Sequence, residues 1–158
     1  MINNEQKVKG FIDVSIEDRK KNKVLYRINN TILRSGKSAL AMSLANEISG
    51  QYYPFYINKI IFGNGGMIEG KLRTVNAERS SLFGSEVISK PIISSIDPNI
   101  PTQATFTSVL TFDDAIGQTI NEMALEMANE SLYSMVAFPD LMKTKDIQIT
   151  WNWRINFI

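Results

Sequence analysis

The stretch Asp-Ile-Gln-Ile-Thr-Trp-Asn-Trp-Arg-Ile-Asn-Phe-Ile at residues 146–158 alternates between apolar and polar side chains. Alternation with a period of two over this length is typical of a half-buried strand in an antiparallel sheet. The segment therefore predicts a scaffold strand with one face in the core and the other in solvent. The apolar face is shared by Ile147, Ile149, Trp151, Trp153, Ile155 and Phe157.

The segment before it predicts a hairpin. Residues 118–127 and 132–138 have strand-like compositions and are separated by the turn sequence Ala-Asn-Glu-Ser. Five more segments read as strands, at residues 7–17, 22–29, 55–62, 85–96 and 103–112. We expect the core to be held by Ile120, Leu125, Tyr133, Val136, Phe138, Trp151 and Trp153.

The N-terminal residues 1–30 predict a hairpin of their own. Val8, Ile12, Val14 and Ile16 share one parity in its first strand, and a polar turn follows. Such a hairpin either packs as an arm on a neighbouring protein or joins the same sheet as the rest of the chain, and the pattern leaves both alternatives open.

One segment predicts a helix, at residues 37–49. Leu40, Ala41, Leu44, Ala45 and Ile48 form an apolar stripe, with Ser35 as the expected N-cap and Gly50 as the C-terminal stop. Ala39, Ala41 and Ala45 are small enough to let this helix approach a sheet closely.

The sum of about eight strands and one helix predicts a mainly β fold, an antiparallel β-sandwich with a helix near residues 37–49. An α+β fold is the alternative. We expect an N-terminal hairpin or arm at residues 1–30 and a single β-sandwich domain at residues 31–158. Within the sandwich, Pro91 places the middle of its strand at an edge or a bulge.

The composition excludes several kinds of chemistry. The chain has no cysteine and no histidine, so it lacks disulfides, thiolate or imidazole metal ligands, and the bases of serine and cysteine hydrolases. The net charge of +1 gives no electrostatic reason to expect nucleic acid or an anionic membrane as a partner. No signal peptide and no apolar run of spanning length is visible, so we expect a soluble protein or part of a soluble assembly.

No motif nominates a catalytic, cofactor-binding or metal-binding residue. Ser-Gly-Lys-Ser at residues 35–38 invites a phosphate-loop interpretation of Lys37, but Thr31 stands where that loop requires glycine. Asp113-Asp114 and Asp97-Pro98-Asn99 read as turns. Glu122, Glu126 and Glu130 are too scattered for a carboxylate pair.

Residues 33–158 carry an ordered series of motifs, in the segments Leu33–Ala41, Ile60–Gly66, Val75–Gly84, Ala104–Leu110, Gly117–Leu125 and Leu132–Pro139. The most distinctive of them reads Gly-Gln-Thr-Ile-Asn-Glu-Met-Ala-Leu, at residues 117–125. In this series the chain resembles the N-terminal domain of phage tail-collar fibre proteins, the attachment module that ties a fibre to the particle. The family pattern at this most distinctive motif is Gly-aromatic-Thr-Ile-Asn-Glu-hydrophobic-Gly-Leu. Residues 1–30 precede the family's usual start, and the sequence stops at Ile158, where a fibre would continue into a shaft.

The resemblance implies a free-standing copy of the attachment module, in a non-enzymatic virion protein of a bacteriophage. We expect a collar, neck, baseplate or tail-fibre adaptor, assembled in host cytoplasm and resident in the virion. Its partners would be other virion proteins and symmetric copies of itself, with no nucleic acid, membrane or cofactor. The expected contact regions are residues 1–30 and the loop at residues 63–84.

Three alternatives stay open. The first is a capsid decoration or head-fibre protein. The second is a module that recognises host-surface glycans through Trp and Tyr, which exposure of Trp151 or Trp153 would favour. The third is an enzyme, either a nucleotide hydrolase that uses Lys37 or a carboxylate hydrolase.

Overall fold

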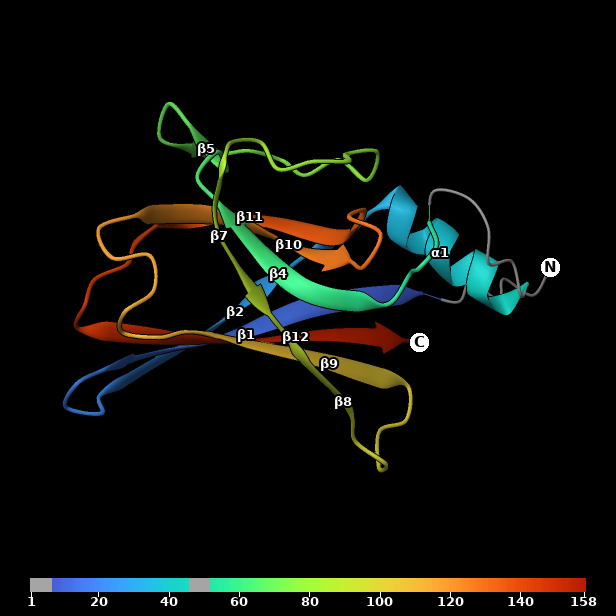
Figure 1. Cartoon of the computed structure of the whole chain (residues 1–158), viewed down its shortest axis with the longest axis horizontal. Coiled ribbons are helices and arrows are strands. Elements are labelled where there is room, and N and C mark those ends of the chain that lie inside the picture. Colours follow the sequence, from blue (N-terminus) through green and yellow to red (C-terminus); the bar gives the residue numbers. More distant parts are fainter. Residues whose placement is uncertain (1–6, 46–51) are drawn as a thin grey trace.

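The computed structural model describes residues 7–45 and 52–158 and has two five-stranded antiparallel sheets packed face to face (Figure 1). Strands make up 55% of the structure and helix 8%, which confirms the predicted mainly β fold over the α+β alternative. The strands are β1 (Val8–Asp18), β2 (Lys23–Asn29), β3 (Thr31–Ile32), β4 (Ile57–Gly63), β5 (Met67–Ile68), β6 (Lys71–Leu72), β7 (Glu86–Pro91), β8 (Ile93–Ile96), β9 (Gln103–Leu110), β10 (Thr119–Met127), β11 (Leu132–Met142) and β12 (Ile147–Phe157), and the helix is α1 (Arg34–Leu44).

The order of strands is β2-β1-β12-β9-β8 in the first sheet, called sheet A, and β3-β11-β10-β4-β7 in the second, called sheet B. Strand β12 lies in the centre of sheet A, where Trp151 faces Val14 of β1 and Trp153 faces Phe106 of β9. The terminal strand predicted at residues 146–158 is therefore confirmed. The hairpin of β1 and β2 also belongs to sheet A, with β1 paired to β12 from Val8 to Asp18.

The core lies between the sheets. Trp151 and Trp153 are both 0% exposed, and the Trp151 ring lies 5.3 Å from Phe62 and 5.6 Å from Phe138, centroid to centroid. All the predicted core residues are buried: Ile120, Leu125, Tyr133, Val136, Phe138, Trp151 and Trp153. Burial of this much aromatic surface accounts for much of the driving force for folding.

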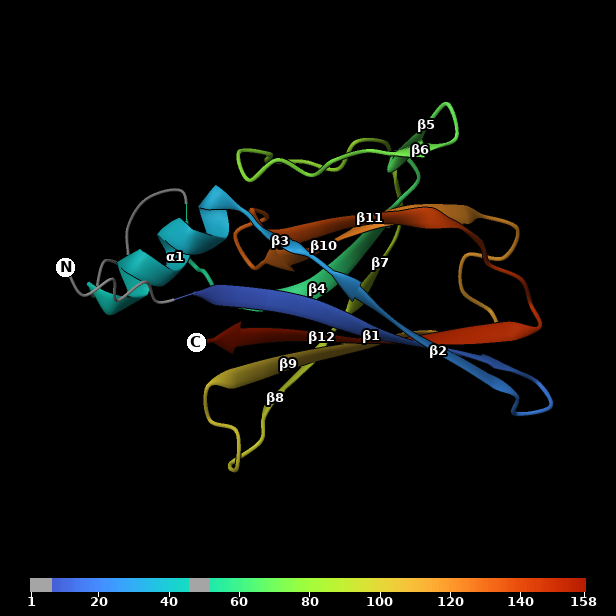
Figure 2. The same ribbon diagram turned by 180° about the vertical axis from the view of Figure 1, so that it is seen from behind.

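At each side of the sandwich, one stretch of chain crosses from one sheet to the other (Figures 1 and 2). The strand predicted at residues 85–96 ends in sheet B at Pro91, and the chain resumes as β8 in sheet A from Ile93. Proline has no N–H to donate to a ladder, so a strand readily ends there. On the other side, β2 leaves sheet A at Asn29 and β3 joins sheet B, where Thr31 faces Met135.

Helix α1 begins three residues earlier than predicted. Leu33 is its N-cap and contributes no side-chain hydrogen bond, so the prediction that Ser35 caps the helix is wrong. The Ser35 hydroxyl lies inside the first turn and donates instead to the carbonyl of Leu132. Ile48 and Gly50, which define the predicted end, lie outside the described residues.

The buried face of α1 also differs from the predicted stripe. Gly36 and Ala39 are buried against β11, whereas Ala41, Leu44 and Ala45 are exposed. A Cβ at Gly36 would lie 2.4 Å from the Tyr133 carbonyl oxygen, so the absence of a side chain sets how closely the helix approaches the sheet. The described residues contain no helix of the length and apolar character needed to cross a membrane.

Candidate functional site

The loop that follows β4 packs on the outer face of sheet B (Figures 1 and 2). It contains the short β5–β6 hairpin and then returns across the sheet. Its side chains Val75, Leu82 and Phe83 cover a small second core, made of Leu33, Ile61, Ala124, Leu132 and Met135. The loop predicted as a contact region is thus largely a fixed part of the fold.

A buried carboxylate holds both ends of this loop. Glu122 is 0% exposed, and its Oε1 accepts hydrogen bonds from the N–H groups of Gly65 at 2.7 Å and Gly84 at 2.9 Å. Its Oε2 accepts a third, from the N–H of Phe83 at 2.7 Å. Hydrogen bonds to an ionised acceptor are roughly twice as strong as neutral ones, so Glu122 is the main polar anchor of the loop.

Asn121 extends the same anchor. Its Oδ1 accepts a hydrogen bond from the N–H of Gly66 at 2.7 Å, and its Nδ2 donates to Asp140 at 2.9 Å. The pairing of β10 with β11 shifts register between Ile120 and Glu122. Such a bulge re-aims side chains, and here two consecutive residues both bond the loop.

The glycines of the loop are required by close backbone approach. A Cβ on Gly65 would lie 2.1 Å from the backbone nitrogen of Gly84, and one on Gly66 would lie 2.1 Å from the carbonyl oxygen of Asn121. A Cβ on Gly63 would lie 2.7 Å from Oε1 of Glu122. The Gly-Asn-Gly-Gly sequence is therefore the place where the chain turns tightly over the carboxylate.

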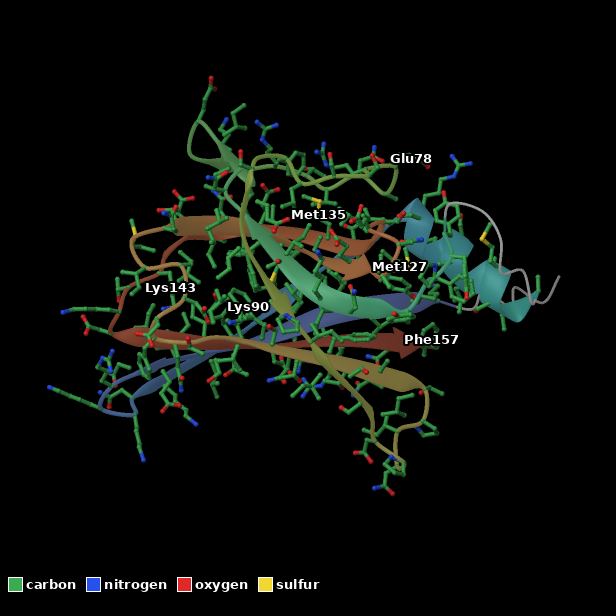
Figure 3. All side chains as sticks on the ribbon, in the orientation of Figure 1. Glu78, Lys90, Met127, Met135, Lys143 and Phe157 are labelled. Carbon is green, nitrogen blue, oxygen red and sulfur yellow. The ribbon has the colours of Figure 1, made fainter. Side chains whose placement is uncertain are left out.

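The far end of the loop is tied to helix α1. The N–H of Arg34 donates to the carbonyl of Ala77 at 2.8 Å, and its guanidinium pairs with Glu78 at 3.1 Å (Glu78 is labelled in Figure 3). The Arg79 guanidinium lies 3.8 Å from the centre of the Phe83 ring, a distance typical of a cation–π contact.

The tip of the β5–β6 hairpin projects beyond this anchored region. Glu69 and Gly70 both have positive φ, 49° and 73°, which is the backbone pattern of a two-residue type I′ turn. Ile68 and Leu72 on either side are each 50% exposed. Exposed apolar side chains on both faces of a protruding hairpin are suited to contact with another protein.

The outer strand of sheet A is the second exposed feature. Sequence alternation predicts that Val24, Tyr26 and Ile28 face the core, and their register opposite β1 agrees with that. Val24 is nevertheless 62% exposed and Leu25, on the opposite face, 73%. Because β2 is an edge strand, no further strand covers these side chains within the described parts of the chain, residues 7–45 and 52–158.

The two exposed features border one cavity. A space of about 400 Å³ is lined by Tyr26 and Ile28 of β2, by Leu72 of β6, and by Pro139 and Leu141 of β11. The structure therefore brings part of each predicted contact region to the same side of the sandwich, β2 from residues 1–30 and Leu72 from residues 63–84, while residues 1–6 lie outside the described part of the chain. We call β2, the β5–β6 tip and this cavity the contact side.

An ionic network stiffens β2 from the solvent face of sheet A. Asp13 of β1 accepts hydrogen bonds from Arg27 of β2 at 2.7 Å and 3.1 Å and from Arg154 of β12. The Arg27 guanidinium also lies 4.1 Å from the centre of the Phe11 ring. The hydrogen bond from Arg27, with the charge of Arg154, lowers the pKa of Asp13 below its ordinary value of 3.8, although partial burial opposes this.

The lowered pKa of Asp13 predicts a dependence of stability on pH. Because the pKa of Asp13 is lower in the folded state than in the unfolded state, its ionised carboxylate stabilises the fold above pH 3.8. This stabilisation is lost as the pH falls through the folded-state pKa of Asp13. We expect Asp13→Asn to cost less than about 1 kcal/mol at pH 7, since the network is partly solvated. Urea unfolding at pH 7 and pH 3 should show the difference from wild type shrink on acidification, and Asp146→Asn is the control with little effect at either pH. A difference that grows towards pH 3 would contradict the assignment.

The remaining sequence candidates lie at an exposed position, in a turn and in an ion pair. Lys37 is exposed in the first turn of α1, and the segment before it forms β3 rather than a phosphate loop. Asp114 binds Lys90 at 2.8 Å and both the N–H and hydroxyl of Thr111, which closes a turn. Glu126 pairs with Lys59 at 2.9 Å. Among the described residues, no group of three or more His, Cys, Asp or Glu could hold a metal ion.

One buried charged residue has no counterpart in the sequence-based predictions. Lys143 is 0% exposed, and its Nζ donates to the carbonyls of Thr144 at 2.9 Å and Phe112 at 3.4 Å (Lys143 is labelled in Figure 3). Burial lowers the pKa of this ammonium group, while the nearby Asp114 and Asp113 oppose the shift. Lys143 joins two loops at one end of the sandwich.

A second cavity, of about 440 Å³, opens between the sheets on the side of β8. Its lining includes Phe55, Ile96, Phe106 and Phe157, with Ser94 among its few polar groups. No carboxylate, ammonium or guanidinium group is among the residues that line it. The cavity offers apolar surface and no acid–base chemistry of that kind.

Comparisons of the chain with models of protein families, with curated proteins and with solved structures find no match.

Proposed function

We propose that the protein is a non-enzymatic structural component of a bacteriophage virion, a collar, neck, baseplate or tail-fibre adaptor that joins other virion parts through strand and loop contacts. The observation that carries this proposal is the contact side. An open strand edge, a hairpin with exposed apolar side chains and an apolar cavity lie together there.

The arrangement of the motifs supports the same proposal. The segments that resemble the tail-collar module lie far apart in sequence, at residues 60–66, 75–84 and 117–125. In the fold they meet at Glu122, whose carboxylate bonds Gly65, Phe83 and Gly84. Because these motifs contact one another at one carboxylate, their joint occurrence supports the resemblance more strongly than any single motif does.

The burial of tryptophan argues against a glycan-recognition platform built on Trp151 or Trp153, and leaves only exposed tyrosines such as Tyr53 and Tyr56 for that alternative. Trp151 and Trp153 are both 0% exposed. We therefore expect native emission that is blue-shifted from that of the urea-unfolded chain and weakly quenched by acrylamide. Emission at the unfolded wavelength with strong quenching would place at least one indole in solvent and restore a tryptophan platform.

Image reconstruction of the intact particle, with this chain located in the density, tests the proposal. We expect the chain in a neck or baseplate ring, touching tail or fibre proteins through β2 or the β5–β6 tip. A position on the outer capsid lattice would overturn the adaptor role and assign a decoration or head-fibre role. A particle without the chain would overturn the structural proposal as a whole.

A further inference from the structure

We propose that β2 pairs antiparallel with β2 of a second copy of this chain, about a two-fold axis through Tyr26, so that two copies of sheet A become one continuous sheet. This inference deepens the proposed assembly role by naming a second copy as a partner, and in that sense it rests on that role. It depends on four features of β2: its open backbone groups, its register, its charges and its exposed side chains.

The open backbone groups belong to alternate residues. At one end of the hairpin the N–H of Asp18 bonds the carbonyl of Asn22, and at the other the N–H of Asn30 bonds the carbonyl of Gly10. The two pairs continue the β1–β2 register by one residue at each end, and in such a register narrow and wide pairs alternate. It follows that Val24, Tyr26 and Ile28 direct their backbone groups to β1. The outward groups, open to another strand, belong to Lys23, Leu25, Arg27 and Asn29.

A two-fold axis through Tyr26 uses all of these outward groups. Tyr26 is the midpoint of β2, so Lys23 faces Asn29 of the second copy and Leu25 faces Arg27. Both are pairs of outward-directed residues, as hydrogen bonding across the new edge requires. Tyr26 faces its own copy in a position without hydrogen bonds, where side chains approach most closely.

The charges select this register over its neighbours. With the axis through Leu25, Lys23 would face Arg27 of the second copy, and with the axis through Arg27 two guanidinium groups would face each other. Like charges directly opposite each other destabilise a strand pair. The Tyr26 register avoids both and places Val24 opposite Ile28, an apolar pair on the face towards the core.

The edge carries only one of the usual protections against pairing, the charges of Lys23 and Arg27. Edge strands are commonly shortened, bulged, or interrupted by proline. β3 has two residues, β8 has four, and β7 ends in Pro91. β2 has seven residues, no proline and an unbroken register with β1, and it exposes Val24 and Leu25. A second copy covers all seven, whereas pairing with β8 of another copy would cover only four.

The absence of cysteine from the chain makes the register testable by single-cysteine crosslinking. Facing residues without hydrogen bonds lie about 4.5 Å apart at Cα, within the range of a disulfide. We expect Tyr26→Cys to form a disulfide-linked dimer under mild oxidation, seen on a non-reducing gel. Val24→Cys is the matched control on the same strand and face, because its two copies would lie roughly 13 Å apart and should not crosslink. Equal crosslinking of both variants, or none of Tyr26→Cys, would overturn the register.

Sedimentation equilibrium of the full chain tests the dimer itself. Wild type should show mass above the 17.8 kDa of one chain, rising with concentration. Leu25→Lys places an ammonium group opposite Arg27 of the second copy and should raise the dimer Kd at least about tenfold, whereas Leu25→Glu should lower it. Leu25 is largely exposed, so both variants should keep the circular dichroism spectrum of wild type.

Wild type that stays at one chain mass, or variants that shift the Kd in the same direction, would overturn the pairing. A chain that is monomeric but is located in a virion ring would contradict the dimer and support the adaptor role. A chain that dimerises but is absent from the particle would support the dimer and contradict the adaptor role.

Discussion

Replacing Glu122 with alanine is expected to lower the free energy of unfolding by about 3 kcal/mol or more, because three backbone N–H donors lose their acceptor at once. The carboxylate is fully buried and bonds the N–H groups of Gly65, Phe83 and Gly84. Without it, three donors beneath the loop lose their acceptor, and an unsatisfied buried polar group costs roughly 1–3 kcal/mol. Urea unfolding monitored by tryptophan fluorescence measures the loss, and limited proteolysis should show early cleavage between residues 64 and 85.

Two further variants make this prediction specific. Glu122→Gln keeps the shape and one acceptor oxygen but turns an N–H donor towards Phe83 or the glycines, so its loss should lie between wild type and alanine. Glu126→Ala is the comparison on the same strand: its carboxylate is also buried, but it pairs with the partly exposed Lys59 and not with three loop N–H groups, so its loss should be smaller than that of Glu122→Ala. A Glu122→Ala protein as stable and as protease-resistant as Glu126→Ala would show that the loop is held by Val75, Leu82 and Phe83 instead.

Periodicity predicts the central strand β12 well because the polarity of the side chains on each of its faces matches the burial of that face. Trp151 and Trp153 lie between the sheets, and the intervening polar residues lie on the solvent face of sheet A, so the pattern follows burial. The same argument fails for β2. Val24 and Tyr26 have the parity of a core face, but β2 is the last strand of its sheet, and alternation says nothing about which strand stands at an edge.

The anchor at Glu122 is not visible to periodicity for a different reason. The bulge between Ile120 and Glu122 breaks the period of two, so Asn121 and Glu122 look like ordinary polar strand residues. The signals that point to them are the Thr-Ile-Asn-Glu motif and the glycine run at residues 63–66. Three short strands, β3, β5 and β6, are also unpredicted, since two residues are too few to show any period.

Helix α1 shows how tertiary contact overrides local propensity. The predicted stripe at Ala41, Leu44 and Ala45 follows hydrophobicity, but the described structure buries Gly36 and Ala39. The helix is placed by the closeness of its first turn to β11 and by the Ser35 hydrogen bond to Leu132. A small residue in a polar first turn carries little weight in a hydrophobicity pattern, so this contact is missed.

Gly36→Ala is expected to lower the free energy of unfolding by about 1–3 kcal/mol, the cost of overpacking a close contact. Helix propensity alone predicts the opposite sign, since alanine in a helix interior is favoured over glycine by roughly 1 kcal/mol. The new Cβ would lie 2.4 Å from the carbonyl oxygen of Tyr133, which lies on β11 between β3 and β10 and already accepts the N–H of Leu33 at 3.0 Å, so the helix has to move away. That movement would strain the Ser35 hydrogen bond and the link between Arg34 and Ala77.

The neighbouring substitution Lys37→Ala is the matched control. Lys37 is exposed one residue further along the same turn, so alanine there should change the free energy of unfolding by less than about 0.5 kcal/mol. Urea unfolding of the two variants in parallel separates the effect of the close contact from that of helix propensity. If Gly36→Ala is as stable as Lys37→Ala, or more stable than wild type, the contact with Tyr133 is not what positions α1, and the loop that α1 holds through Arg34 must be supported from the Glu122 side alone.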